Sequence, residues 1–201
     1  NIQPAETKKK VLVIGGGGAG MEAAFVARKR GHEVVLCEKQ ENPGGLVKIA
    51  AVPIAKQDLL KVIQYMERKL HHAGVEIRLG CEVTKEMLKT EFNDYEVVAS
   101  TGALPLVVGA FTGFKQCVTA DDVLAGKAFP GRKVVIIGGG SVGCETADYL
   151  APLVNDLFPR NREIILLEMA EGIMQQESGP GRSLLTQRMM KKGVQIHCKA
   201  K

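Results

Sequence analysis

Two glycine-rich stretches hold the residues of this 201-residue sequence whose types and spacing could do chemistry. In each, an apolar run leads into the spacing Gly-x-Gly-x-x-Gly, formed by Gly15, Gly17 and Gly20 and again by Gly138, Gly140 and Gly143. In this spacing the first glycine makes a tight turn, the second lets the backbone approach a pyrophosphate, and the third lets helix and strand pack closely. The helix that follows directs its free N–H groups at the phosphates. The two stretches therefore predict two dinucleotide-binding sites.

An acidic residue ends the next apolar run after each glycine stretch. Glu38 and Glu168 stand at these positions. A carboxylate there accepts hydrogen bonds from the adenosine ribose, suits a free 2′-hydroxyl and repels a 2′-phosphate. We therefore expect NAD(H) rather than NADP(H) at Glu168, although the nearby Arg160 and Arg162 could complicate this preference. The alternative, a glycine-rich turn without a ligand, does not account for the strand, helix and acid that accompany both stretches.

The elements that must position these residues are repeated along the chain. Gly15 corresponds to Gly138, and each copy continues through a helical stretch, a second apolar run, another helix and a third apolar run. Such runs with helices between them predict a parallel sheet covered on both faces. We expect an α/β fold of two tandem Rossmann-like, doubly wound, mostly parallel domains, over residues 8–112 and 113–201. The second copy lacks the further strand that the first has at 95–99, so we expect its domain to be incomplete and the chain to be a piece of a longer protein.

Three helix boundaries can be predicted from apolar spacing and from glycine and proline. One helix ends at Gly74, with the helically spaced positions Leu59, Leu60, Ile63, Met66 and Leu70. A later helix ends at Gly193, with the apolar positions Leu184, Leu185 and Met189. Pro152 interrupts the helical stretch 141–158, so we expect a break near Ala151.

The composition argues against several other classes of protein. Hydrophobic residues make up 45% and charged residues 24%, which indicates a globular core. The net charge of +5 is mild and only 4% of the residues are aromatic, so we expect no nucleic-acid partner. No apolar run is long enough for a membrane span, and we expect a cytoplasmic protein. The five cysteines form no C-x-x-C pair, so we expect neither a disulfide framework nor a metal site.

The order of the motifs resembles a known family. VLVIGGGGAGMEAAFVARKRGHEVVLCEK, NPGGLV, VVASTGALP, TADDVL and VVIIGGGSVGCETADYL are similar to the tandem FAD- and NAD-binding region of the 2-enoate reductase, 2,4-dienoyl-CoA reductase and trimethylamine dehydrogenase family. The resemblance implies an NAD(P)H-dependent flavoprotein oxidoreductase in which this region follows a TIM barrel with FMN and a 4Fe-4S cluster. Electrons would pass from NADH through FAD, cluster and FMN to an unsaturated acid or thioester. The barrel and the cluster cysteines are not in this sequence. We also expect that the whole protein could form a homo-oligomer.

The resemblance also implies roles for particular residues. The FAD pyrophosphate would lie on Gly15, Gly17, Gly18, Ala19 and Gly20, and its ribose on Glu38 and Lys39. The rest of FAD would approach Gly45, Leu46, Val83, Thr101 and Gly102. NAD(H) would lie on Gly138, Gly140, Ser141, Val142, Gly143, Glu145 and Glu168. No catalytic residue is assigned.

Some of these residues also fit ordinary structural roles. Val83 fits a core valine as well as a contact to adenine. Glu145 fits an acid favoured by a helix N-terminus, and Lys39 fits a solvated lysine at a strand end.

Two other functions stay open at this point. A disulfide-reductase relative would need a redox-active cysteine pair, which the stretch after Glu38 lacks. A nucleotide-binding module without turnover would hold ADP or nothing and serve structure or assembly. The resemblance includes trimethylamine dehydrogenase, in which this region holds ADP in place of FAD.

Overall fold

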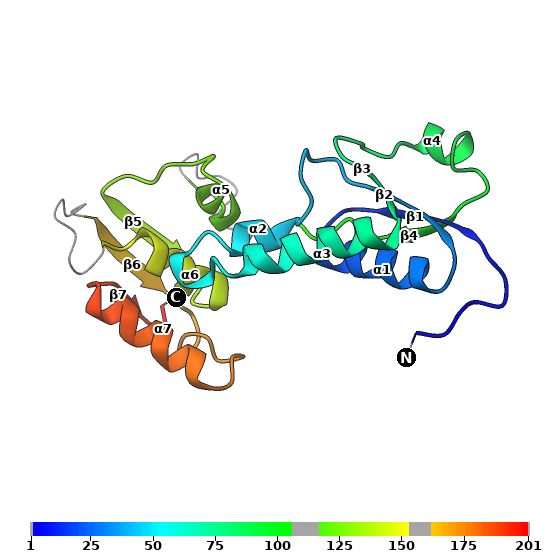
Figure 1. Cartoon of the computed structure of the whole chain (residues 1–201). Helices are drawn as coiled ribbons and strands as arrows, with labels where there is room; N and C mark the ends of the chain where they lie inside the picture. Colours follow the sequence, from blue (N-terminus) through cyan, green and yellow to red (C-terminus); the bar gives the residue numbers. More distant parts are fainter. Residues whose placement is uncertain (1, 106–116, 153–161, 201) are drawn as a thin grey trace. The chain divides into compact units, whose positions relative to one another are not determined.

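The computed structural model describes residues 2–105, 117–152 and 162–200. The chain forms two compact units, Asn1–Leu104 and Pro105–Lys201, and each is described by itself (Figure 1). The boundary predicted between residues 112 and 113 lies outside the described residues and stays a prediction. No helix in the described ranges is both long and apolar enough to cross a membrane.

The first unit contains a parallel sheet of four strands in the order β3-β2-β1-β4. The strands are β1 (Lys10–Ile14), β2 (Glu33–Cys37), β3 (Glu76–Arg78) and β4 (Glu96–Ala99). In the register of the sheet, Leu12 lies between Val35 and Val97. The helices are α1 (Gly18–Lys29), α2 (Leu46–Ala50), the 3-10 helix η1 (Ile54–Lys56), α3 (Leu59–Ala73) and α4 (Lys85–Lys89).

Both faces of the first sheet carry a core. The helices α1 and α3 lie on one face, where the buried Val11 and Val13 join a cluster with residues of both helices (Figure 1). On the other face Leu12 and Val35 pack with Phe92. Burial on both faces explains why β1 and β2 read as unbroken apolar runs.

The α3 helix confirms its predicted end and corrects its predicted face. Gly74 takes the left-handed conformation that ends the helix, with φ 74° and ψ 38°. Ile63 and Leu70 are buried, but Leu60 is 41% exposed. The apolar face is therefore narrower than predicted, because Leu60 follows Leu59 by one residue and turns away from the sheet.

The second unit contains a parallel sheet of three strands in the order β5-β6-β7. The strands are β5 (Lys133–Ile137), β6 (Glu163–Leu167) and β7 (Gln195–His197). The helices are α5 (Ala120–Leu124), α6 (Ser141–Leu150) and α7 (Pro180–Lys191). The predicted break before Pro152 is confirmed, because α6 ends at Leu150 and Ala151 is extended.

The two faces of the second sheet differ in burial. Ile164 and Leu166 are buried in a core with Leu185 and Met189 of α7, whereas Leu184 is exposed. Val135 and Ile137, on the opposite face of β5, are 56% and 53% exposed. In the part of this unit that the structure describes, the core lies on one face of the sheet, and cover on the other face stays a prediction.

Candidate functional site

The first glycine turn joins β1 to α1 and is shaped by the protein's own packing. Gly15 leaves the strand with φ +105°, a conformation that residues with side chains avoid, and its N–H donates to the Cys37 carbonyl over 2.8 Å. A Cβ on Gly15 would lie 2.4 Å from the Ser100 carbonyl oxygen, and a Cβ on Gly20 would lie 1.9 Å from the Gly15 oxygen. No side chain fits at either position.

The second glycine turn joins β5 to α6 in the same way. Gly138 has φ +102°, and its N–H donates to the Leu167 carbonyl over 2.9 Å. A Cβ on Gly143 would lie 1.9 Å from the Gly138 oxygen, the same clash as in the first turn. The first and third glycines of both motifs therefore fold the turn.

The middle glycine of each motif has no such explanation in the protein. Gly17 and Gly140 are the N-caps of α1 and α6, with φ −73° and −71°, which other residues adopt readily. A Cβ on either would meet no protein atom within 4 Å. The bare backbone faces open space at a helix N-terminus, and this is the space that a diphosphate requires.

A carboxylate is held beside each glycine turn by two backbone N–H groups. Glu38 accepts from Gly16 over 2.6 Å and from Gln40 over 2.9 Å. Glu168 accepts from Gly139 over 2.6 Å and from Ala170 over 2.7 Å. Each carboxylate uses both oxygens in this way, and each oxygen keeps a lone pair for a ribose hydroxyl.

The two acids differ in their surroundings. Glu38 is buried, with 7% of its surface exposed. Glu168 is half-buried, and the N–H groups of Ala170 and Gly139 hold its pKa below the ordinary value. Both carboxylates are therefore fixed in place at neutral pH, with Glu168 in its charged form.

The sequence analysis missed the glycines that hold these acids. A Cβ on Gly16 would lie 3.0 Å from Cβ of Glu38, and a Cβ on Gly139 would lie 2.7 Å from Ile173 and 3.0 Å from Cβ of Glu168. The signal was present as an additional glycine inside each motif, at a position where the spacing rule allows any residue.

The loop after β2 returns to the first glycine turn. Gly44, a second residue that the sequence analysis missed, donates to the Gly16 oxygen over 2.8 Å. Gly45 has φ +50°, and a Cβ there would lie 3.2 Å from Cα of Gly17. Leu46 begins α2 and is 48% exposed. The structure therefore places Gly45 beside Gly17, and the predicted contact of Gly45 and Leu46 with the flavin side of FAD stays a prediction.

The other predicted residues are placed as follows. Gly18 and Ala19 form the first turn of α1, and Ser141 and Val142 form the first turn of α6. The residues Lys39, Thr101 and Gly102 are exposed. Glu145 is half-buried within α6. Val83 packs against the cluster of Leu12, Val35 and Phe92, which favours its role as a core valine.

The expectation that Arg162 lies near Glu168 is wrong. Arg162 precedes β6, whose opposite end carries Glu168, and its guanidinium donates to the carbonyls of Gly131, Leu150 and Pro130 over 3.1, 3.3 and 3.3 Å. The strand β6 lies between Arg162 and Glu168 and rises by about 3.3 Å per residue. The two residues, although close in the sequence, therefore lie at opposite ends of this strand. Arg160 lies outside the described residues.

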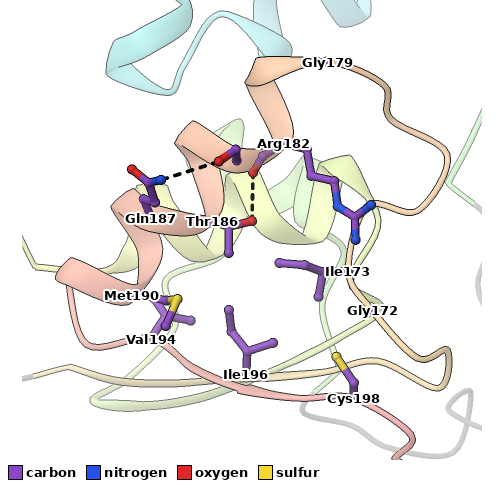
Figure 2. Close-up of a pocket in the computed structure, with 11 residues that line it drawn as sticks. Gly172, Ile173, Gly179, Arg182, Thr186, Gln187, Met190, Val194, Ile196 and Cys198 are labelled. Atoms are coloured by element: carbon purple, nitrogen blue, oxygen red, sulfur yellow. Dashed lines mark hydrogen bonds between the residues drawn. The ribbon is translucent and has the colours of Figure 1, made fainter.

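A hollow of about 590 Å³ lies between α7 and β7, and Ile173 separates it from Gly139 of the second glycine turn. Ile173, Met190, Ile196 and Cys198 give it an apolar lining, and Arg182 reaches along its rim (Figure 2). None of the predicted site residues lines it. We therefore place the candidate site at the glycine turns.

Known proteins share this arrangement over nearly the whole chain. Bilirubin reductase from Mediterraneibacter gnavus is 38% identical over 198 residues, which are 97% of this chain and 29% of that protein. Cinnamate reductase from Clostridium sporogenes is 41% identical over 174 residues, which are 87% of this chain and 25% of that protein. The solved 2-naphthoyl-CoA reductase complex has a TM-score of 0.89 and 30% identity, over 100% of this chain and 29% of that chain.

These similarities confirm the resemblance predicted from the motifs. The chain spans less than a third of each of these relatives. Its residues 9–201 match the family described as pyridine nucleotide-disulphide oxidoreductase, which uses FAD and NAD(H), and the chain belongs to that family.

Proposed function

We propose that this chain is the dinucleotide-binding, electron-input module of a flavin-dependent oxidoreductase. FAD binds at the first glycine turn, within a domain over residues 8–112, and NADH binds at the second, within a domain over residues 113–201. When bound, the two cofactors supply the transfer of a hydride from NADH to FAD, and the protein supplies binding and orientation.

One observation carries this proposal: the same open helix N-terminus is built twice. A Cβ on either of the N-cap glycines, Gly17 or Gly140, would meet no protein atom within 4 Å. Beside each N-cap glycine, backbone N–H groups fix a carboxylate, that of Glu38 or Glu168. A ribose hydroxyl could donate a hydrogen bond to either carboxylate. A diphosphate on the helix and a ribose on the carboxylate together describe an adenosine diphosphate, the part that FAD and NADH share.

The residues of each site then have distinct tasks. In the first site the backbone of Gly17, Gly18 and Ala19 donates to the diphosphate, while Glu38 fixes the ribose. Gly45 closes the turn from the other side because its lack of a side chain lets it approach Gly17. In the second site Ser141, Val142 and the glycines Gly138, Gly140 and Gly143 correspond to these residues.

The geometry at Glu168 favours NADH over NADPH. Both carboxylate oxygens are bound to backbone N–H groups, so the negative charge cannot swing away from a 2′-phosphate. Arg162, which is close to Glu168 in the sequence, is bound to carbonyls at the far end of β6 and does not offset this charge.

The relatives support a destination for the electrons. Cinnamate reductase and 2-naphthoyl-CoA reductase are named for conjugated acid or thioester substrates. We therefore propose that the whole protein reduces an activated C=C bond, in a TIM barrel that carries FMN and a 4Fe-4S cluster and is continuous with this chain. Substrate choice would belong to that barrel.

The assignment of one cofactor to each unit can be tested with a reciprocal pair of variants. Gly17→Ala and Gly140→Ala should both fold, since neither added Cβ meets a protein atom. Gly17→Ala should weaken FAD binding, and Gly140→Ala should weaken NADH binding, each by roughly 10- to 100-fold, because hydrogen bonds to a charged group are lost. Fluorescence titration of the purified chain with each nucleotide measures both affinities.

Gly131→Ala is the matched control, because a Cβ there also meets no protein atom and the residue lies outside both turns. Its two affinities should equal those of the unaltered chain. Failure of the unaltered chain to bind either nucleotide, or equal effects of both variants on both nucleotides, would refute the proposed function.

A further inference from the structure

A carboxylate from a distant part of the sequence lies at the N-terminus of α6. The loop between β6 and α7 is fastened to the second glycine turn by Met174, whose N–H donates to the Gly139 oxygen over 2.7 Å. Three residues later, Glu177 accepts a hydrogen bond from the hydroxyl of Ser141 over 2.5 Å. Ser141 is the first residue of α6. The loop therefore brings a negative charge to the position where the proposed diphosphate would bind.

No residue of α6 itself supplies an anion to this N-terminus, and Glu168 binds the N–H of Gly139 just before it. The N-cap of α6, Gly140, makes no side-chain capping hydrogen bond, and the first turn of the helix contains no acidic residue. The N-terminus of a helix carries a partial positive charge that attracts anions. Glu177 places a carboxylate beside this N-terminus through the Ser141 hydroxyl, and a diphosphate that binds the N–H groups of α6 would lie at the same place.

The first unit provides an internal comparison. Gly44 is fastened to Gly16 just as Met174 is fastened to Gly139, and both follow the ribose-binding acid at the same distance in the sequence. The pair that corresponds to Ser141 and Glu177 is Gly18 and Val47, where a Cβ on Gly18 would lie 3.9 Å from a Val47 methyl group.

The same position at the helix N-terminus is thus neutral in the first unit and carries a carboxylate in the second.

The loop that carries Glu177 has room to move. Residues 175–180 are exposed. Behind the loop, the hollow between α7 and β7 borders it at Gly172, Ile173 and Gly179 (Figure 2). The loop is anchored in the core by the buried Ile173 and Met174, and Glu177 lies in the exposed part that follows, so its side chain can turn away without opening the buried cluster.

We infer that Glu177 competes with the diphosphate of the nicotinamide nucleotide for the N-terminus of α6. The carboxylate stabilises the helix in the free protein and is displaced when the nucleotide binds. It thereby lowers the affinity of the second site and favours exchange of its nucleotide. This inference rests on the proposed function, because it requires a dinucleotide at the second glycine turn.

Glu177→Gln tests the inference, since it removes the charge and keeps the shape. The purified 201-residue chain is titrated calorimetrically with ADP-ribose, which carries the diphosphate and both riboses without nicotinamide. Glu177→Gln should bind ADP-ribose roughly five-fold more tightly, as expected for one charge near a helix N-terminus. The difference should shrink as salt is added. Binding of adenosine, which has no diphosphate, should not change.

Two further variants separate this effect from general ones. Glu163→Gln removes a carboxylate from the opposite end of β6 and should leave both affinities unchanged. Glu177→Val copies the first unit and should also tighten ADP-ribose binding. Without ligand, Glu177→Gln should unfold at a lower temperature, because α6 loses its anion.

The outcomes distinguish the two proposals. If the unaltered chain binds ADP-ribose and Glu177→Gln binds it equally or more weakly, Glu177 is not a competitor, and the proposed function stands. If neither chain binds ADP-ribose, both proposals fail. Binding by Glu177→Gln alone would support the inference in its strongest form.

Discussion

The carboxylate of Glu168 should stabilise the second unit even when no nucleotide is present. Its two oxygens accept hydrogen bonds from Gly139 over 2.6 Å and from Ala170 over 2.7 Å. Glu168→Gln keeps the size of the side chain but replaces one oxygen by an amide group that can only donate. One of the two backbone N–H groups then faces another donor, and the other bond loses its charge.

The size of the effect follows from these two bonds. A hydrogen bond to a charged group contributes about 1.5–3 kcal/mol, compared with about 0.5–1.5 kcal/mol for a neutral one. Because Glu168 is half-buried, water can satisfy part of what is lost. We expect Glu168→Gln to lower the free energy of unfolding by about 1–2 kcal/mol, or the midpoint by roughly 5–10 °C for a unit of this size.

The dependence on pH gives a second signature. The folded protein holds the pKa of Glu168 below its ordinary value of 4.5, so the folded state binds fewer protons than the unfolded state. This contribution to stability is complete above pH 4.5 and is lost as the pH falls through the lowered pKa. Glu168→Gln has no such proton to bind, so the difference between the two chains should shrink on acidification.

Thermal unfolding followed by circular dichroism at several pH values measures both effects. Hydrogen exchange at Gly139 and Ala170 locates the loss in the second glycine turn. Glu171→Gln is the control. The Glu171 side chain is 81% exposed and pairs with the exposed Lys199, so its loss should change the free energy of unfolding by less than about 0.5 kcal/mol. Equal stability of Glu168→Gln and the unaltered chain at neutral pH would refute this account of the acid.

Two other buried features of the chain give measurable outcomes. Asp148→Asn should lower the free energy of unfolding, measured by urea denaturation, by about 3–5 kcal/mol. The reason is that the Lys192 side chain, only 8% exposed, loses the carboxylate that lies 2.9 Å from its ammonium group. A loss below about 1 kcal/mol would contradict this. Burial raises the pKa of Cys37 and of Cys144 to about 12. A thiol reagent at neutral pH should therefore label the exposed Cys117 at least roughly 100-fold faster than these two buried thiols. Equal labelling rates would show that the buried thiols are not protected.

The parts of the fold that could be predicted from the sequence are those with local signals. The strands before each glycine turn are short apolar runs, and α3 ends at Gly74 because glycine alone takes the left-handed conformation without strain. The glycine spacing predicts the turns because three of its positions are fixed by the geometry of strand and helix. Repetition of the pattern after Gly138 then predicts the second unit.

The parts that could not be predicted depend on contacts between distant residues. Arg162 lies close to Glu168 in the sequence, but β6 runs between them and carries them to opposite ends of the sheet. Gly16 and Gly139 occupy positions that the motif leaves free, and their importance appears only once an acid packs on them. Likewise, the exposed face of β5 carries valine and isoleucine, the same residue types as its covered face, so the sequence does not tell the two faces apart.

The difference between Val47 and Glu177 has a kinetic consequence if the two sites hold FAD and NADH. A retained cofactor gains nothing from rapid release, whereas a nicotinamide nucleotide must leave after each hydride transfer. At a fixed rate of association, a five-fold weaker affinity is a five-fold faster dissociation, and mutations near a binding site act mostly on that step. A carboxylate at the helix N-terminus therefore accelerates exchange at the second site without altering the glycine turn or the ribose-binding acid. Two sites with the same backbone can in this way differ in residence time through one side chain.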